Sequence, residues 1–248
     1  MSGSEILTSF HTVISRLKNA PESVNRIYID SARRDKRMIN FINQAKQIGC
    51  NLYFVKTERI KNLIKHDRHN GVVAFCSKIR FVEKNIDEIL TVSKYPPLLL
   101  ILDGITDPHN LGACLRSAEA AGVNAVIAPR NRSANLNSEI VNHVSCGASD
   151  SIPYMIVTNL ASMLRTLKER GIQLVGTDDK ASENLYQINA CQPIAWIMGS
   201  ENGGLRRLTR EICDKLISIP MLGSVENLNV SVASAVCLYE SVRQRFYI

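Results

Sequence analysis

The chain has 248 residues and a mass of 27.6 kDa, a length that suits two modest domains or one large one. Hydrophobic residues make up 45% and charged residues 21%, so the chain can bury a core and is not wholly disordered. The longest aliphatic run, residues 98–102, is far shorter than a bilayer span, and residues 1–10 lack the basic and apolar regions of a signal peptide. We therefore expect no membrane partner.

Seven cysteines lie along the chain, and each is at least 22 positions from the next. Their number is odd and no CxxC pair occurs, which favours reduced thiols in a cytoplasmic protein and disfavours structural zinc. His66 and His69 lie three residues apart, but no further ligand is apparent near them. The sequence therefore predicts no metal site.

The positive charge is concentrated in the first third of the chain. Residues 1–80 contain 15 Lys and Arg against 6 Asp and Glu, a net +9, whereas the remaining residues contain 15 and 17, a net −2. Such asymmetry suggests a polyanion-binding module joined to a nearly neutral one. A solvated, lysine-rich surface explains the same charge equally well, so charge alone leaves both interpretations open.

Residues 1–76 are predicted to form a small α/β domain, and the charged, weakly periodic residues 77–97 a linker. The predicted elements are a helix at 4–18, a strand at 26–30, a helix at 35–48, a strand at 51–55, a short helix from Thr57 and a strand at 72–76.

Residues 98–248 show a second alternation of aliphatic strands and helices, which is typical of a mostly parallel sheet covered on both faces. Trp196 lies within one of these strands and is predicted to be a core residue. The expected strands are 98–102, 125–128, 173–176, 194–198 and 216–219, with helices between them that include 110–121 and a final helix at 228–245.

Three polar loops follow strands of this second region. They comprise residues 103–112, 199–204 and 220–229, and the first leads into a helix that carries Arg116. In parallel α/β domains the ligand site lies beyond the carboxyl ends of the strands, where such loops meet. Taken singly, each loop is explained as a turn or a helix cap, and none is a P-loop or a GxGxxG fingerprint.

Taken together and in this order, the loops closely resemble the three motifs of SpoU-type (TrmH-like) RNA 2′-O-ribose methyltransferases of the SPOUT superfamily. The run DPHNLG at residues 107–112 with Arg116 resembles the first motif, residues 198–205 the second and residues 219–233 the third. The resemblance covers nearly the whole chain and points to the branch that methylates a guanosine of bacterial 23S rRNA. It implies an L30e-like RNA-binding fold for residues 1–76 and a methyltransferase domain with a C-terminal trefoil knot for residues 98–248.

Two positions depart from the motifs. Asn227 stands where the family usually has Ser, and Asn202 stands where it usually has Gly. Asn also adopts a left-handed backbone, so the second change is compatible with the same turn. The first change alters a polar side chain near the implied reaction centre.

The implied reaction moves a methyl group from S-adenosylmethionine (AdoMet) to a ribose 2′-hydroxyl. The resemblance makes Arg116 the residue that activates this hydroxyl, but a guanidinium is a poor base because its pKa lies above about 12. We therefore favour the hypothesis that Arg116 binds an RNA phosphate, orients the ribose and stabilises the developing alkoxide.

The resemblance also assigns roles to the other motif residues. Asn110 caps the helix of Arg116 and helps to place the substrate, and Glu201 accepts a hydrogen bond from the ribose or from Asn110. Asn229 contacts the reacting nucleotide, and Asn227 takes the place of a substrate-contacting Ser. The residues expected around AdoMet are Met198, Gly199, Ile219, Met221 and Leu228, with the backbone of Gly199, Ile219 and Leu228 against the donor.

The final helix has no charged residue between positions 228 and 239, and a helix that is apolar all round is buried all round. Gly112, Ala113 and Ala120 surround Arg116 and would allow another surface to approach closely, although the alanines are equally explained by their high helix propensity. We therefore expect a homodimer that acts on 23S rRNA. Two alternatives are the same chemistry on tRNA or another rRNA nucleotide, and a non-catalytic RNA-binding or ribosome-assembly protein.

Overall fold

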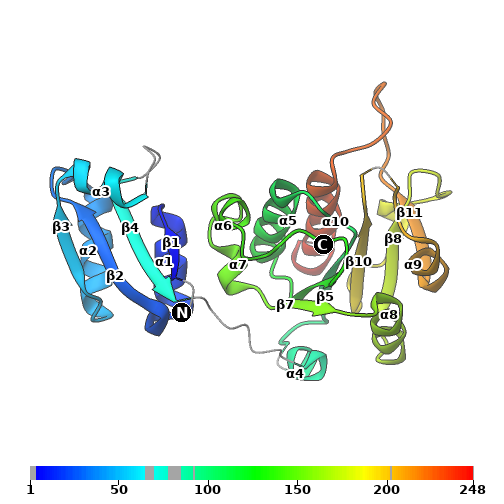
Figure 1. The fold of residues 1–248 in the computed structure, drawn as a ribbon. Helices are drawn as coiled ribbons and strands as arrows, with labels where there is room; N and C mark the ends of the chain where they lie inside the picture. Colours follow the sequence, from blue (N-terminus) through cyan, green and yellow to red (C-terminus); the bar gives the residue numbers. More distant parts are fainter. Residues whose placement is uncertain (1–3, 65–69, 78–84, 92, 202, 248) are drawn as a thin grey trace. The chain divides into compact units, whose positions relative to one another are not determined.

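The structure is a computed structural model, and it describes residues 4–64, 70–77, 85–91, 93–201 and 203–247 (Figure 1). Its chain divides into two compact units: unit 1 comprises Met1–Arg80 and Cys146–Ser151, and unit 2 comprises the rest. His66 and His69, considered above as metal ligands, lie outside the described residues.

Unit 1 contains a sheet with the strand order β1-β4-β2-β3, in which β4 pairs antiparallel with β1 and β2, and β2 pairs in parallel with β3 (Figure 1). Helices α1 and α2 pack on one face of this sheet, where Phe10 and Phe41 meet Ile27 and Ile29 in a closed apolar core. The elements are β1 (Ser4–Leu7), α1 (Phe10–Asn19), the 3-10 helix η1 (Pro21–Ser23), β2 (Val24–Asp30), α2 (Lys36–Gln47), β3 (Leu52–Val55), α3 (Thr57–Ile64), β4 (Val72–Ser77) and α7 (Ala148–Ser151).

The predicted helix at 4–18 is wrong in its first half. Residues Ser4–Leu7 form β1, which pairs antiparallel with β4, and the helix begins only after Ser9, whose side chain accepts a hydrogen bond from the Thr12 amide. Ile6 lies four residues before Phe10, so it fits a helical stripe in sequence although it sits in a strand. The strand forms because β4, about 70 residues away, offers it a hydrogen-bonding edge.

Arg16 is a buried cation of unit 1. Its side chain is 1% exposed and donates hydrogen bonds to Glu5 Oε2 at 2.7 Å and to the two carboxylate oxygens of Asp150 at 2.9 and 3.0 Å. A buried charge that is paired on two sides is compensated within the protein. Arg16 therefore contributes to the internal structure of unit 1, and the exposed Lys and Arg residues carry its surface charge.

Unit 2 contains a parallel sheet with the strand order β7-β6-β5-β10-β8-β11-β9 in the part of the chain that is described (Figure 1). The predicted mostly parallel α/β fold is thus confirmed. The strands are β5 (Leu98–Asp103), β6 (Ala125–Pro129), β7 (Tyr154–Val157), β8 (Gln173–Thr177), β9 (Glu183–Asn184), β10 (Ile194–Gly199) and β11 (Lys215–Ser218). The helices are α4 (Ile86–Thr91), α5 (Pro108–Ala120), α6 (Glu139–Val144), α8 (Leu160–Glu169), η2 (Leu185–Gln187), α9 (Arg207–Ile212) and α10 (Val230–Phe246).

Helices cover both faces of this sheet. On one face, Leu160 and Leu164 of α8 pack against Leu99 and Ile101 of β5. On the other face, α10 packs against α5 and β10. There the indole nitrogen of Trp196, which is fully buried as predicted, donates a hydrogen bond to Ser241 Oγ at 2.8 Å.

The stretch predicted as a linker, residues 77–97, is not irregular throughout. It contains helix α4, and Ile86 and Ile89 of this helix are buried in the core of unit 2. This helix has only six residues, which is too short to show a periodic pattern, so the sequence did not predict it. All seven cysteines are free thiols, and no helix among the described residues is long and apolar enough to cross a membrane.

Gly112 of α5 allows a close contact inside the chain. A Cβ at this position would lie 2.8 Å from Val144 Cβ of α6, so α5 and α6 approach each other where only hydrogen fits. The sequence predicted that this small residue allows another surface to approach closely. In the structure that surface is α6 of the same chain.

Candidate active site

The first two motif loops leave the sheet side by side. Strands β5 and β10 are parallel neighbours, and their last residues, Asp103 and Gly199, are paired in register. The loop after β5 leads into α5, and the loop after β10 leads into α9. The third loop, residues 220–229, with the preceding Ile219 connects β11 to α10. Because all these strands are parallel, their carboxyl ends share one edge of the sheet.

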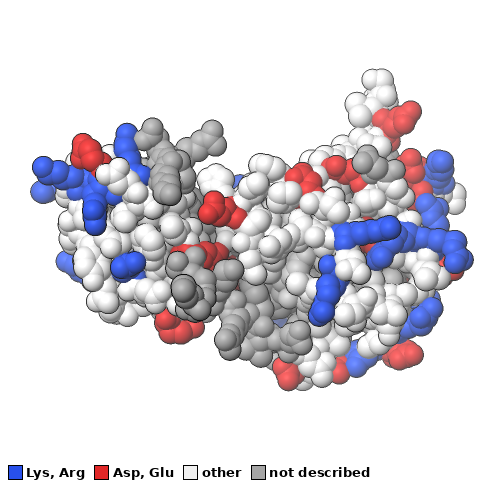
Figure 2. Space-filling model, in the orientation of Figure 1, with Lys and Arg blue, Asp and Glu red and all other residues white. Residues whose placement is uncertain are grey.

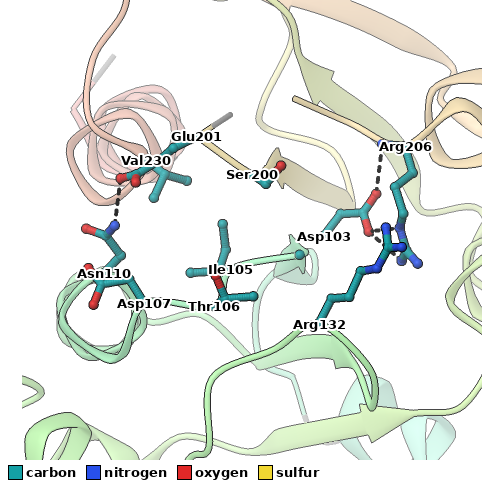
Figure 3. Close-up of a pocket in the computed structure, with 11 residues that line it drawn as sticks. Asp103, Ile105, Thr106, Asp107, Asn110, Arg132, Ser200, Glu201, Arg206 and Val230 are labelled. Carbon is teal, nitrogen blue, oxygen red and sulfur yellow. Dashed lines mark hydrogen bonds and ion pairs between the residues drawn. The ribbon is translucent and has the colours of Figure 1, made fainter. Parts of the chain in front are cut away.

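A pocket of about 280 Å³ lies at this edge (Figure 3). It is bounded by the loop after β5, the loop after β10 and the first residue of α10. Its volume is near the lower end of the roughly 300–1,000 Å³ typical of small-molecule sites, which suits part of a nucleotide. The lining residues are Asp103, Gly104, Ile105, Thr106, Asp107, Asn110, Arg132, Ser200, Glu201, Arg206 and Val230.

One polar side chain from each motif joins a hydrogen-bonded cluster, which we call the amide–carboxylate triad: Asn110, Glu201 and Asn229. The Asn110 amide donates to Glu201 Oε1 at 2.6 Å, which is one of the two partners predicted for Glu201. The Asn229 amide donates to the same Glu201 oxygen at 2.9 Å and to Asn110 Oδ1 at 3.0 Å. A carboxylate oxygen that accepts two amide donors fixes the orientation of both amides. The triad therefore presents its remaining donor and acceptor positions in a defined direction.

The N-cap of α5 is a different residue from the one that the sequence predicted. This helix begins at Pro108, and its cap is Asp107, whose carboxylate accepts a hydrogen bond from the His109 amide at 3.1 Å. Asn110 lies inside the first turn and is 9% exposed, so the expectation that it caps the helix is wrong. Asn229 is the cap of α10 and accepts a hydrogen bond from the Ser231 amide at 2.9 Å.

Arg116 does not belong to the triad in the structure. It lies on α5 six residues after Asn110, which corresponds to about 9 Å along the helix axis and to another side of the helix. Its side chain is exposed, makes no hydrogen bond or ion pair with the described residues and does not line the pocket. Its guanidinium is therefore available to a molecule outside this chain, such as RNA or a second copy.

Gly199 must be a glycine. A Cβ at this position would lie 2.2 Å from the Gly204 carbonyl carbon and 2.4 Å from the Leu205 nitrogen. The chain folds back over Gly199 because Ser200 and Gly204 exchange two backbone hydrogen bonds, of 3.1 and 2.8 Å. Backbone contact on this scale leaves no room for a side chain. The turn that carries Glu201 thus depends on Gly199.

The other residues expected around AdoMet lie apart from the pocket. Met198 is fully buried, and its sulfur contacts Thr177 Oγ1 at 3.6 Å, so only its backbone is offered to a ligand. Ile219, Met221 and Leu228 are half-buried residues of the third loop. Asn227 is exposed and makes no hydrogen bond with other described residues. Much of this loop extends away from unit 2, as the orange segment of Figure 1 shows, and its Leu222 is fully exposed.

These positions suit a nucleoside that is recognised through the backbone. Gly199, Thr177 and Ser218 end the adjacent parallel strands β10, β8 and β11, so their peptide groups line one edge of the sheet. Peptide N–H and C=O groups match the donor and acceptor edge of an adenine, and the apolar Ile219 directly follows β11 at this edge. No group of three or more potential metal ligands occurs among the residues that the structure describes.

Three charged residues of the pocket were not singled out from the sequence. Asp103 has a fully buried side chain that pairs with the Arg206 guanidinium at 2.5 Å. The same carboxylate accepts a hydrogen bond from the backbone amide of Arg206 at 3.2 Å. Arg132 has a left-handed backbone, with φ of +61°, which is uncommon for a residue other than glycine. It follows β6, the parallel neighbour of β5. Ligand sites lie beyond the carboxyl ends of parallel strands, so the loop after β6 is also predicted to reach this site.

Comparisons with known proteins identify the family of this chain. A family model described as "SpoU rRNA Methylase family" matches residues 97–239, and one described as "RNA 2'-O ribose methyltransferase substrate binding" matches residues 10–82. A Bordetella pertussis protein named 23S rRNA (guanosine-2'-O-)-methyltransferase RlmB is 58% identical over 99% of this chain and 99% of its own.

Solved structures show the same fold. The crystal structure of an RNA 2'-O ribose methyltransferase has a TM-score of 0.81 at 26% identity and covers 98% of this chain and 90% of that one. AviRb from Streptomyces viridochromogenes, a SpoU methyltransferase solved with AdoMet, has a TM-score of 0.78 at 24% identity over 98% of this chain and 91% of that one. The chain belongs to the SpoU rRNA methylase family, and the family predicted from the three motifs is thus confirmed.

Proposed function

We propose that this protein transfers a methyl group from AdoMet to the ribose 2′-hydroxyl of a guanosine in 23S rRNA. The amide–carboxylate triad carries the proposal, because it joins one polar side chain from each of the three motifs at a pocket. The RlmB relative, which matches this chain from end to end, bears the name of that reaction.

The residues of the chain supply orientation and charge stabilisation. A ribose hydroxyl is a weak nucleophile until its proton leaves or its negative charge is stabilised. The Glu201 carboxylate and the Asn110 amide, held in fixed directions by Asn229, would bind the ribose by hydrogen bonds. Arg116 lies on another side of α5 from the triad, so the Arg116 of a second copy of the chain would bind a phosphate next to this ribose and stabilise the alkoxide with its planar donors. When AdoMet is bound, its sulfonium provides the methyl group.

Five residues would hold AdoMet: Met198, Gly199, Ile219, Met221 and Leu228. The side-by-side carboxyl ends of β10, β8 and β11 support this assignment, since they expose backbone groups along one edge. The fold match to AviRb, whose structure contains AdoMet, supports it too.

We also infer the finer organisation that the family implies: an L30e-like RNA-binding domain over residues 1–76, a connecting segment at 77–97 and a catalytic domain at 98–248 with a trefoil knot. A knot of this kind requires the segment after β11 to lie against the loop that follows β10, and Asn229 meets Glu201 of that loop at 2.9 Å. The excess of basic residues in the first third supports RNA capture there. A protein that acts on ribosomal RNA belongs in the cytoplasm.

The protein is proposed to act as a homodimer through α10. Val232 and Tyr239 of this helix are 47% and 50% exposed, and with the half-buried Val236 they follow the i, i+4, i+7 spacing of one helix face. The sequence predicted that the helix is buried on every side, and within one chain this face is open. A second copy is the simplest cover for an apolar helix face, and it would bring another Arg116 to the assembly.

Tyr239→Glu is expected to convert the dimer to a monomer, because it places a charge in the apolar interface. Size-exclusion chromatography with light scattering at micromolar concentration measures the change. Leu208→Glu is the matched control, since Leu208 of α9 is 48% exposed but lies outside this face. A wild-type protein that runs as a monomer would contradict the proposal.

Ribose methylation of 23S rRNA tests the function itself. Deletion of the gene is expected to remove one 2′-O-methylguanosine from 23S rRNA, and purified protein with AdoMet should restore it to the RNA. Calorimetry should show AdoMet binding. Methylation of tRNA alone would favour the related tRNA chemistry, and an absence of AdoMet binding would favour a role in RNA binding or ribosome assembly without catalysis.

A further inference from the structure

The sheet of unit 1 has a second face, opposite the core packed by α1 and α2. Residues that alternate with core residues point to this face: Arg26 and Tyr28 alternate with Ile27 and Ile29 in β2. The strand registers pair Tyr28 with Tyr53 of β3, and Arg26 with Phe75 of β4. Three aromatic rings from three adjacent strands, Tyr28, Tyr53 and Phe75, therefore lie together. We call this surface the aromatic face.

The rings of the aromatic face are in direct contact. Tyr28 and Tyr53 stack with their centroids 5.4 Å apart and an angle of 28° between the planes. Tyr28 meets Phe75 edge-on at 5.7 Å, and the Arg26 guanidinium lies 4.8 Å above the Phe75 ring. The result is a continuous aromatic surface with a cation at one end.

Solvent reaches this surface. Tyr53 is 48% exposed, whereas Tyr28 and Phe75 are half-buried, so Tyr53 offers the most open ring. Stacked aromatic rings are usually found in a protein core, where burial of their large apolar area stabilises the fold. An exposed aromatic cluster is therefore a candidate for binding a partner.

The charge around the aromatic face favours a polyanion. Lys56 follows β3 directly, and Lys56, Arg59 and Arg26 are exposed, as is the acidic Glu58 of α3, so the basic residues are in excess. Figure 2 shows several Lys and Arg side chains, with an acidic side chain among them, over the end of unit 1 where α3 lies. Asp30 at the end of β2 is buried and accepts a hydrogen bond from Thr57 Oγ1 at 2.8 Å, so it does not oppose this charge at the surface.

We propose that the aromatic face binds RNA by stacking unpaired bases on Tyr53 and Tyr28, while the basic residues around it contact the phosphates. Aromatic rings stack with any base, because each base has a π-face, and RNA recognition by exposed sheet aromatics depends on bases that are free of pairing. The inference deepens the proposed function, on which it rests, by naming a single-stranded or looped segment of the rRNA as the part captured.

Tyr53→Ala in the full-length protein tests this inference. Fluorescence anisotropy would measure binding of a labelled single-stranded 12-mer RNA and of a duplex RNA hairpin. We expect the variant to lose about tenfold or more in affinity for the single strand and little for the duplex. Tyr53→Phe retains the ring and should bind like the wild type. Tyr186→Ala is the matched control, since Tyr186 is 61% exposed but belongs to unit 2.

The slope of affinity against salt should be unchanged in Tyr53→Ala, because the change removes a stacking contact and no phosphate contact. Equal losses for single-stranded and duplex RNA, or no loss for either, would overturn the inference. A change of oligomeric state in Tyr53→Ala would also overturn it and would identify the aromatic face as a protein interface. Circular dichroism would establish that the variant is folded.

Methyl transfer separates this inference from the proposed function. With 23S rRNA and AdoMet, Tyr53→Ala should raise the KM for RNA and leave kcat unchanged, since the aromatic face is not part of the catalytic unit. A wild-type protein that methylates no RNA would refute the proposed function and leave the stacking result to stand. Normal methylation together with unchanged single-strand binding in Tyr53→Ala would refute only the inference.

Discussion

Gly199→Ala is expected to abolish methyl transfer and to destabilise unit 2. The new Cβ would meet the backbone of Gly204 and Leu205 at 2.2 and 2.4 Å, and backbone cannot rotate away as a flexible side chain can. Overpacking usually costs about 1–3 kcal/mol, and we expect the upper end of this range because main chain lies on both sides of the contact. The turn that carries Glu201 must then move, and with it the triad.

Thermal unfolding and a methyl-transfer assay measure the two effects. At about 3 kcal/mol, a protein of this size should lose about 6–12 °C in Tm. Gly223→Ala is the matched control, because a Cβ at Gly223 has no neighbour within 4 Å and that loop is exposed. A Gly199→Ala variant with wild-type Tm and activity would show that the turn has another conformation in solution.

Arg116→Ala is expected to lower kcat by about 10²–10³ without lowering Tm. Removal of one donor that stabilises developing negative charge has an effect of this size in other enzymes. The side chain is exposed and contacts no other described residue, so the fold does not depend on it. Arg116→Lys should also be impaired, because a lysine ammonium cannot replace the planar, forked donors of arginine at a phosphate and an alkoxide.

Single-turnover kinetics at saturating RNA and AdoMet would measure this loss apart from binding. Arg165→Lys is the matched control, since Arg165 of α8 is also exposed and has no partner among the residues described in the structure. Near-normal turnover by Arg116→Lys would exclude a need for the forked donor. A large drop in the Tm of Arg116→Ala would instead indicate a structural role.

Local patterns identified most of the strands and helices of the second region. The aliphatic run at 98–102 became the buried strand β5, and Trp196 became a core residue, because burial on both faces of a parallel sheet leaves a nearly continuous apolar signal. Helix α2 was also close to its prediction, since Asp35 is a strong N-cap. The order and spacing of the three motifs identified the family.

Long-range contacts decided the remainder. Strand β1 exists because β4 pairs with it, and α4 exists because Ile86 and Ile89 reach the core of unit 2. The sequence pointed to Asn110, Glu201 and Asn229 as site residues. The prediction that Asn110 caps the helix was wrong, and the hydrogen bond from Asn229 to Asn110 was not predicted. It also did not show that Arg116 lies outside the triad.

The sequence by itself determined which segments are apolar, where most helices begin and which residue types stand in the loops, because these properties depend on neighbours within a few positions. Only the tertiary structure decided that Gly199 has no space for a side chain and that Tyr28, Tyr53 and Phe75 form one surface. These features arise from atoms that chain folding brings together across tens of residues, and no local pattern encodes such distances.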